Sequence, residues 1–359
     1  MTGWFRDQAS SATIKTTPVD RLLAITRKSL RFRAANFCDW CHRFGPSRKR
    51  FFPAAIPRKF ALLLVALILP LLAQGNTATG HAPQPVKKNC APGVVLKVSA
   101  GVAAQGSLLL AEITGLDDRQ KVKAEWDGRD VPLWPESQPA RTLHAMIGVD
   151  LEKSPGSYQW KISWTAADGS SAACGVPITV RTGKFATERL TVEKQYVQPD
   201  PEQQKRAEED QKKMRAIYDT VTPEVLWKGK FRLPLKGEIA GKNFGRRRVL
   251  NGEARSPHAG IDFPAAAGTP VYAAQAGRVA LAEDLYYSGN TVVIDHGFGI
   301  YTLYAHLSEI AVHSGDTVAA LAEIGKVGAT GRVTGPHLHW GLTIDHARVN
   351  GLQIVQKEP

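Results

Sequence analysis

The stretch from His258 to His339 opens with HAGID, residues 258–262, and closes with GPHLH, residues 335–339. Side chains alternate between the two faces of an extended strand, so His258 and Asp262, four residues apart, are expected to point the same way. Gly260 between them adds no side chain on that face, and His337 and His339 share a face for the same reason. Two imidazoles and a carboxylate, brought together, can hold one metal ion and leave a position for water, as a catalytic zinc site requires.

Three motifs carry this pattern: H-x-G-x-D at 258–262, Y-x-H-L at 304–307 and G-x-x-T-G-P-H-L-H at 331–339. Taken together, they resemble the lysostaphin/LytM-type zinc endopeptidases, which cut peptide cross-links in bacterial cell walls. The resemblance covers residues 235–350. The competing interpretation is a β domain with scattered structural histidines. The residues that flank each motif argue against this interpretation.

The resemblance implies a role for each motif residue. Carried over by motif position, His258, Asp262 and His339 bind one zinc ion, Zn²⁺. His306 and His337 flank the bound water and the scissile carbonyl. A neutral histidine can accept the proton of the water, and a second can stabilise the developing oxyanion. The sequence leaves open which of the two does which.

Two positions depart from the family pattern. Leu321 stands where the family usually has a turn glycine, which puts the geometry of that hairpin in question. Gly341, two residues after His339, stands where an acidic residue is common, so the support of the ligand is expected to differ there. His296 and His313 match no ligand position, and we interpret both as structural or exposed.

The rest of this region is predicted to be a compact antiparallel β domain with a groove, because glycine turns separate short apolar runs. It also resembles biotinyl and lipoyl carrier domains. Such carriers lack the His/Asp set, and they present a modifiable lysine at a hairpin tip, whereas Lys326 lies in the segment Ile324–Gly328. The Arg246–Arg248 run has two interpretations: contact with carboxylates of a peptide stem, or solvated surface charge.

The net charge of +13 belongs to the N-terminal leader. Residues 1–74 hold 13 Lys/Arg and three Asp/Glu, whereas the remaining chain holds 33 and 30. The body is therefore nearly neutral, and no nucleic-acid partner is expected.

An export segment is predicted at residues 59–76, where the apolar run 60–73 follows Arg58 and Lys59 and precedes small polar residues. An uncleaved membrane anchor through 60–73 is the alternative, although the run is short of the ~20 residues that a span needs. The chain is thus expected in the periplasm or cell envelope. Residues 1–58 form an uncertain leader; one hypothesis is a mis-assigned start, with translation beginning at a non-Met codon upstream of Arg58. A Cys-x-x-Cys-His haem pattern at Cys38–His42 lies before the export segment, which argues against haem attachment.

The middle of the chain is predicted to be an immunoglobulin-like β-sandwich, because apolar-alternating runs at 94–98, 107–113, 157–164 and 176–180 are separated by turn residues. Cys90 and Cys174 follow the export segment, so a disulfide is expected between them. Asp200 and Pro201 then predict the start of a helix that runs to Tyr218.

These observations predict a mainly β chain with five parts, namely an uncertain leader at 1–58, a signal peptide or anchor at 59–76, a sandwich at 85–195, a helical linker at 196–225 and a zinc peptidase domain at 226–359. The function expected is an exported zinc metalloendopeptidase whose partners are peptidoglycan stem peptides. The alternatives are a non-catalytic wall-binding or hydrolase-regulating protein on the same fold, and a peptidase that acts on proteins.

Overall fold

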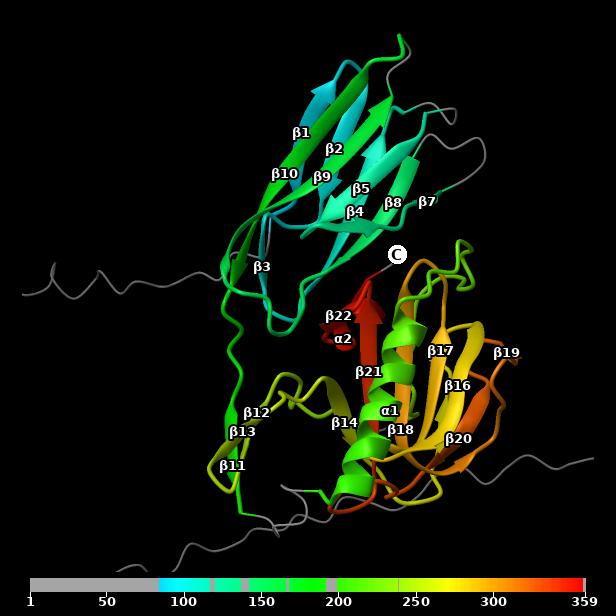
Figure 1. Cartoon of the computed structure of the whole chain (residues 1–359). Coiled ribbons are helices and arrows are strands. Elements are labelled where there is room, and N and C mark those ends of the chain that lie inside the picture. Colours follow the sequence, from blue (N-terminus) through cyan, green and yellow to red (C-terminus); the bar gives the residue numbers. More distant parts are fainter. Residues whose placement is uncertain are drawn as a thin grey trace, which may run out of the picture. The chain divides into compact units, whose positions relative to one another are not determined.

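The computed structural model describes residues 84–116, 120–136, 142–165, 168–191, 199–237 and 239–357. The leader at 1–58, the export segment with its apolar run at 60–73, and the haem pattern lie outside these ranges. No helix within the described ranges is long and apolar enough to cross a membrane. The described chain is mainly β, as the sequence predicts (Figure 1).

The N-terminal part is a sandwich of two five-stranded sheets. Its strands are β1 Val86–Ala91, β2 Val94–Val98, β3 Val102–Ala104, β4 Leu108–Thr114, β5 Val122–Trp126, β6 Arg129–Val131, β7 Trp134–Pro135, β8 Thr142–Gly148, β9 Gly156–Thr165 and β10 Ser171–Arg181. One sheet has the order β1-β2-β4-β8-β7 and the other β3-β10-β9-β5-β6. Every second residue of β9 faces the core, so Trp160, Ile162 and Trp164 are buried. This order, with β3 parallel to β10, is an immunoglobulin-like arrangement.

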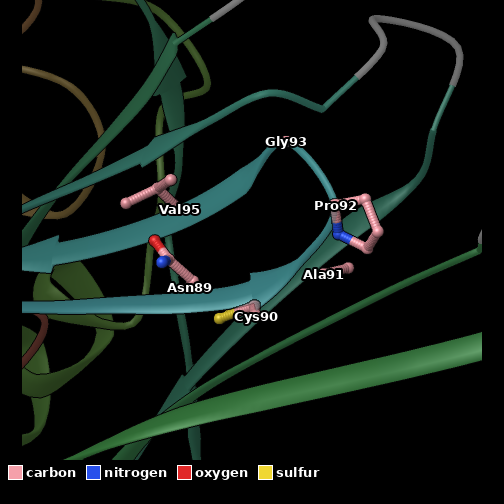
Figure 2. A pocket seen from close by; sticks show the side chains of 6 residues that line it. All are labelled: Asn89, Cys90, Ala91, Pro92, Gly93 and Val95. Atoms are coloured by element: carbon pink, nitrogen blue, oxygen red, sulfur yellow. The ribbon is translucent and has the colours of Figure 1, made fainter.

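A disulfide joins Cys90 on β1 to Cys174 on β10 and thereby links the two sheets, which confirms the predicted pair. Figure 2 shows a shallow hollow beside it at the turn between β1 and β2. The hollow is lined by Asn89, Cys90, Ala91, Pro92, Gly93 and Val95. Its only sulfur is already in the disulfide, so the hollow offers no catalytic group.

Helix α1 spans Pro201–Tyr218, as predicted. The Asp200 side chain accepts a hydrogen bond from the Gln203 N–H at 2.9 Å and so caps the first turn. The helix is mostly charged, but three residues near its C-terminal end are apolar. Met214, Ile217 and Tyr218 pack on Leu281, Leu285, Val293 and Tyr301 of the C-terminal sheet. Burial of this small face holds the helix along the sheet.

The C-terminal part is built on a nine-stranded sheet, with a small three-stranded sheet at its entry. The small sheet contains β11 Thr187–Leu190, β12 Arg247–Leu250 and β13 Glu253–Arg255. The large sheet contains β14 Gly260–Pro264, β15 Pro270–Tyr272, β16 Gly277–Leu285, β17 Gly289–Asp295, β18 Ile300–Ile310, β19 Thr317–Val318, β20 Glu323–Val327, β21 His337–Ile344 and β22 Ala347–Val349. Helix α2, Leu352–Gln356, follows.

The strand order places the three motifs side by side. Its main path is β14-β21-β18-β17-β16-β19, so the strand that contains His339 lies between the strands that contain Asp262 and His306. His339 has two cross-strand partners: Asp262 on β14 and Ala305 on β18. Antiparallel pairing thus brings residues more than 70 positions apart to one place.

The two departures from the family pattern have different outcomes. Leu321 adopts a left-handed backbone with φ of +62°, and its N–H donates to the carbonyl of Ala273 at 2.9 Å, so the turn forms without glycine. A Cβ at Gly341 would meet only Leu303, at 3.5 Å, which is ordinary contact. His296 is fully buried and His313 is exposed, as the sequence predicts.

Candidate metal centre

Three side chains of the motifs converge on one point. The Nε2 atom of His258 lies 3.0 Å from Oδ1 of Asp262, and the Nδ1 atom of His339 lies 2.9 Å from the same oxygen. The two ring nitrogens are 2.9 Å apart. A tetrahedral zinc ion with bonds of about 2.0–2.1 Å keeps its ligand atoms roughly 3.3 Å apart. The three atoms therefore fit one such ion, with small outward shifts.

Gly260 is required by the packing of this cluster. A Cβ built on Gly260 would lie 2.6 Å from Nε2 of His339 and 2.6 Å from the carbonyl oxygen of Trp340. Both contacts are far below van der Waals distance. The missing side chain therefore makes room for the His339 imidazole itself. The glycine of the H-x-G-x-D motif is thus required for packing as well as for leaving the metal-facing side unobstructed.

Asn243 supports two of the three side chains. Its Nδ2 donates to Oδ2 of Asp262 at 2.7 Å, which leaves Oδ1 directed at the cluster. Its backbone carbonyl lies 3.0 Å from Nδ1 of His258, so that nitrogen carries the hydrogen and Nε2 has the free lone pair. No sequence motif marks Asn243, so its role is visible only in the folded structure.

His306 is held beside the cluster by two carbonyl groups. Its N–H donates to the oxygen of Ser288, and its Nδ1 donates to the oxygen of Thr330, each at 2.9 Å. The residue has a φ of +63°, an uncommon backbone for a non-glycine residue. Burial, and then the charge of His339, lower the pKa of His306 to about 4. Its imidazole is therefore neutral at pH 7, with a lone pair on Nε2.

His337 takes the same tautomer. Its Nδ1 donates to the carbonyl of Gly335 at 2.9 Å, and its Nε2 lies 3.8 Å from Oδ1 of Asp262. The ring centroid is 4.9 Å from that of His306. The structure thus gathers all five predicted site residues, three at the cluster and two beside it.

The side chains at the cluster differ in their exposure to solvent. His258 is 5% exposed, whereas the side chain of His337 retains 21% of its accessible surface. Burial by itself raises the pKa of the Asp262 carboxyl, but its close contacts with the imidazoles of His258 and His339 bring that pKa well below its usual range. Burial also lowers the pKa of His339. Both effects favour the forms that bind a metal: carboxylate and neutral imidazole.

The three consecutive arginines have different surroundings. Arg246 forms an ion pair with Glu188 at 3.1 Å, and Arg247 is exposed. The Nε atom of Arg248 is 4.0 Å from Glu188, at the limit of an ion pair.

Residues 256–351 match Peptidase family M23, so this part of the chain is a peptidase M23 domain. Peptidoglycan DD-endopeptidase ShyA of Vibrio cholerae is 45% identical over 112 residues, which are 31% of this chain and 26% of that protein. The chain therefore spans about a quarter of the length of the curated relatives that it matches.

Solved structures extend the likeness. A Pseudomonas aeruginosa structure described as a peptidase M23 superposes with a TM-score of 0.54 and 29% identity, over 70% of this chain and 94% of that one. The catalytic domain of lysostaphin from Staphylococcus simulans is 30% identical, with a TM-score of 0.31, over 33% of this chain and 93% of that one. The match to the Pseudomonas structure extends well beyond the family domain.

Proposed function

We propose that the chain is an exported zinc metalloendopeptidase that hydrolyses peptide cross-links of bacterial peptidoglycan. The observation that carries the proposal is the convergence of Nε2 of His258, Oδ1 of Asp262 and Nδ1 of His339 within 3.0 Å of one another. A relative that is named a peptidoglycan DD-endopeptidase supports the substrate class.

Zinc is the ion that best suits these ligands. Two imidazoles and one carboxylate fit zinc, whereas magnesium and calcium prefer sites made of oxygen atoms. A zinc ion bound here supplies a Lewis acid that polarises a carbonyl and lowers the pKa of a water. Asn243 fixes the Asp262 carboxylate and the His258 tautomer, so the ligands are oriented before binding.

His306 and His337 move the proton in this proposal. Nδ1 of each ring donates its hydrogen to a carbonyl, so the neutral form of each has its lone pair on Nε2. One of them accepts the proton of the attacking water at Nε2. A histidine that stabilises the oxyanion must first carry a proton on Nε2. The protonated imidazole can later return its proton to the leaving amine.

The part of the chain before the catalytic domain is proposed to be exported, and it serves either as a positioning or binding domain or as a spacer. The disulfide between Cys90 and Cys174 supports export, because disulfides persist in oxidising compartments. We propose the boundaries 85–195 for the sandwich and 226–359 for the peptidase domain, with signal cleavage or anchoring at 59–76. N-terminal sequencing of the exported protein tests the leader; a mature chain that retains residues 1–58 contradicts the mis-assigned start.

The test of the function is digestion of purified cell wall. The full chain, loaded with zinc, is incubated with purified peptidoglycan, and soluble cross-link fragments are separated by chromatography. We expect released fragments with newly formed amino groups. Binding to the wall without release would instead support the non-catalytic alternative. Casein is offered in parallel as a protein substrate. A peptidase that acts on proteins should cut casein, whereas a peptidoglycan endopeptidase should not.

A further inference from the structure

Helix α1 lies on the face of the large sheet that carries the metal cluster. His339 on β21 pairs with Ala305 on β18, and Tyr301 is four residues earlier on the same strand, so His339 and Tyr301 point to the same face. The apolar end of α1 packs on Tyr301, where the ring centroids of Tyr218 and Tyr301 are 5.4 Å apart (Figure 1). The helix is therefore on the side of the peptidase domain where the proposed chemistry takes place.

The N-terminal half of α1 is fastened to the end of β16 and the residues that follow it. The Asp210 carboxylate accepts the backbone N–H of Tyr286 at 2.7 Å. Gln203 accepts the Tyr286 hydroxyl at 2.9 Å, and the Arg206 guanidinium donates to the Asp284 carboxylate at 2.7 Å. The ion pair is exposed and is therefore expected to contribute little. Asp210 is half-buried and bonds the backbone itself, so it is the contact that fixes the path of the chain here.

The loop that follows Tyr286 supports His306. Two residues on, the carbonyl of Ser288 accepts the His306 N–H at 2.9 Å. The N–H of Asn290 donates to Oγ1 of Thr330 at 2.9 Å, and the carbonyl of Thr330 accepts the Nδ1 hydrogen of His306 at 2.9 Å. One partner of His306 thus lies in this loop, and the other is bonded to it.

No side chain separates the loop from the segment that contains Thr330. A Cβ built on Gly289 would lie 2.3 Å from Oγ1 of Thr330 and 2.5 Å from the nitrogen of Gly331. A Cβ built on Gly331 would lie 2.4 Å from the nitrogen of Gly289. Because the two backbones are in direct contact, a shift of the loop is expected to shift Thr330 with it.

His306 depends on this support more than most residues would. Its φ of +63° is in the left-handed region, which a non-glycine residue keeps only where the surrounding structure enforces it. A general base must also lie within hydrogen-bond reach of the proton that it accepts. A small relaxation of the His306 backbone would therefore move its imidazole away from the position that proton transfer requires.

We propose that Asp210 of helix α1 is a positioning residue for the hydrolysis. Through the N–H of Tyr286, Asp210 fixes the loop that holds His306, and so keeps the His306 imidazole aligned with the metal cluster. This inference rests on the proposed function. It gives α1 a part in the peptidase reaction besides its connection of the sandwich to the peptidase domain.

The experiment measures kcat and KM for cleavage of a soluble cross-linked peptide dimer, prepared from peptidoglycan, by the zinc-loaded full chain. Asp210→Ala removes the acceptor of the Tyr286 N–H. We expect kcat to fall about tenfold or more, as slight misplacement of a catalytic group does, while KM and zinc content stay unchanged. Asp210→Asn should retain most of the wild-type kcat, because its amide oxygen can accept the same N–H.

Two results would overturn the proposal. One is a wild-type kcat in Asp210→Ala. The other is an equal loss in the alanine and asparagine variants, since the charge and not the hydrogen bond would then matter. Asp316→Ala is the matched control: Asp316 accepts the backbone N–H of His313 at 2.8 Å in an exposed turn and should have the wild-type kcat. A similar loss in this control would show general destabilisation and would also contradict the proposal.

Hydrogen exchange distinguishes a failure of this inference from a failure of the proposed function. If the wild-type chain cleaves nothing, the peptidase proposal fails, and amide exchange still tests the link between Asp210 and His306. Mass spectrometry of the peptide that covers residues 304–308 measures it in wild type and Asp210→Ala. Exchange that is about tenfold faster in the variant, with unchanged exchange in β21, would support the positioning role. Equal exchange at 304–308 would overturn it.

Discussion

Asn243 donates a hydrogen bond from Nδ2 to Oδ2 of Asp262 at 2.7 Å, and its side-chain oxygen accepts the Asp262 N–H at 3.1 Å. One side chain thus fixes both the carboxylate and the backbone of a proposed ligand. Groups that orient metal ligands in this way contribute to affinity although they do not touch the ion.

Asn243→Ala should therefore weaken metal binding about 10- to 100-fold, the usual cost of losing such a partner. Competition with a zinc chelator measures the change. Asn89→Ala, at an exposed asparagine on β1, is the control and should bind zinc normally. A variant at Asn243 with unchanged zinc affinity would remove the positioning role.

Gly260→Ala should disturb the cluster, whereas Gly341→Ala should be tolerated. The two glycines are cross-strand partners, but a Cβ meets His339 Nε2 at 2.6 Å in the first case and Leu303 at 3.5 Å in the second. We expect the first variant to lose zinc and part of its thermal stability. Metal analysis and thermal unfolding measure both effects. Equal behaviour of the two variants would refute this account of the motif glycine.

Leu321→Gly should stabilise the fold by about 1 kcal/mol, because a left-handed backbone costs a non-glycine residue on the order of 1–2 kcal/mol. Leu321 is 44% exposed, so loss of its side chain removes little buried surface. Ala320→Gly, at a neighbouring exposed residue, should instead lower the stability. Denaturant unfolding measures both. A less stable glycine variant at 321 would show that the leucine side chain contributes more than the strain costs.

His296 should make the fold sensitive to acid. Burial lowers the pKa of His296 to about 4, from an ordinary value of 6.5. The unfolded chain then takes up the proton more readily, so the free energy of unfolding is largest above pH 6.5 and falls as the pH drops towards 4.

Unfolding measured between pH 7 and 4.5 tests this dependence. His296→Gln should have a flatter profile over this range, although its absolute stability is lower because a buried histidine that contacts Ala276 and Thr302 is replaced. His313→Gln, at an exposed histidine, should keep the wild-type profile. Identical slopes for wild type and His296→Gln would exclude His296 as the source.

Much of the site could be predicted from the sequence, because its geometry depends on side-chain alternation in strands. The spacing of His258 to Asp262, and that of His337 to His339, determines that the two side chains of each pair lie on the same face of their strand. Antiparallel pairing of β14 and β21 then places Asp262 opposite His339. The cap at Asp200 likewise marked the start of α1, since capping is local in sequence.

The supporting contacts could not be predicted in this way. Asn243 acts partly through its backbone carbonyl, and His306 is held by carbonyls of Ser288 and Thr330, groups that every residue possesses. The pairing of β12 with β11 also has no local signal, because it joins segments 60 residues apart, such as Thr187 and Arg247. Only the folded chain brings these groups together.

The most direct test of the central claim is the zinc content of two variants, measured together with release of cross-link fragments from purified cell wall. His339→Ala removes a proposed ligand, whereas His337→Ala removes a group beside the cluster whose Nε2 is 3.8 Å from Asp262. We predict that His339→Ala loses both zinc and activity, and that His337→Ala loses activity while it largely keeps zinc. Wild-type activity in both variants would contradict the account.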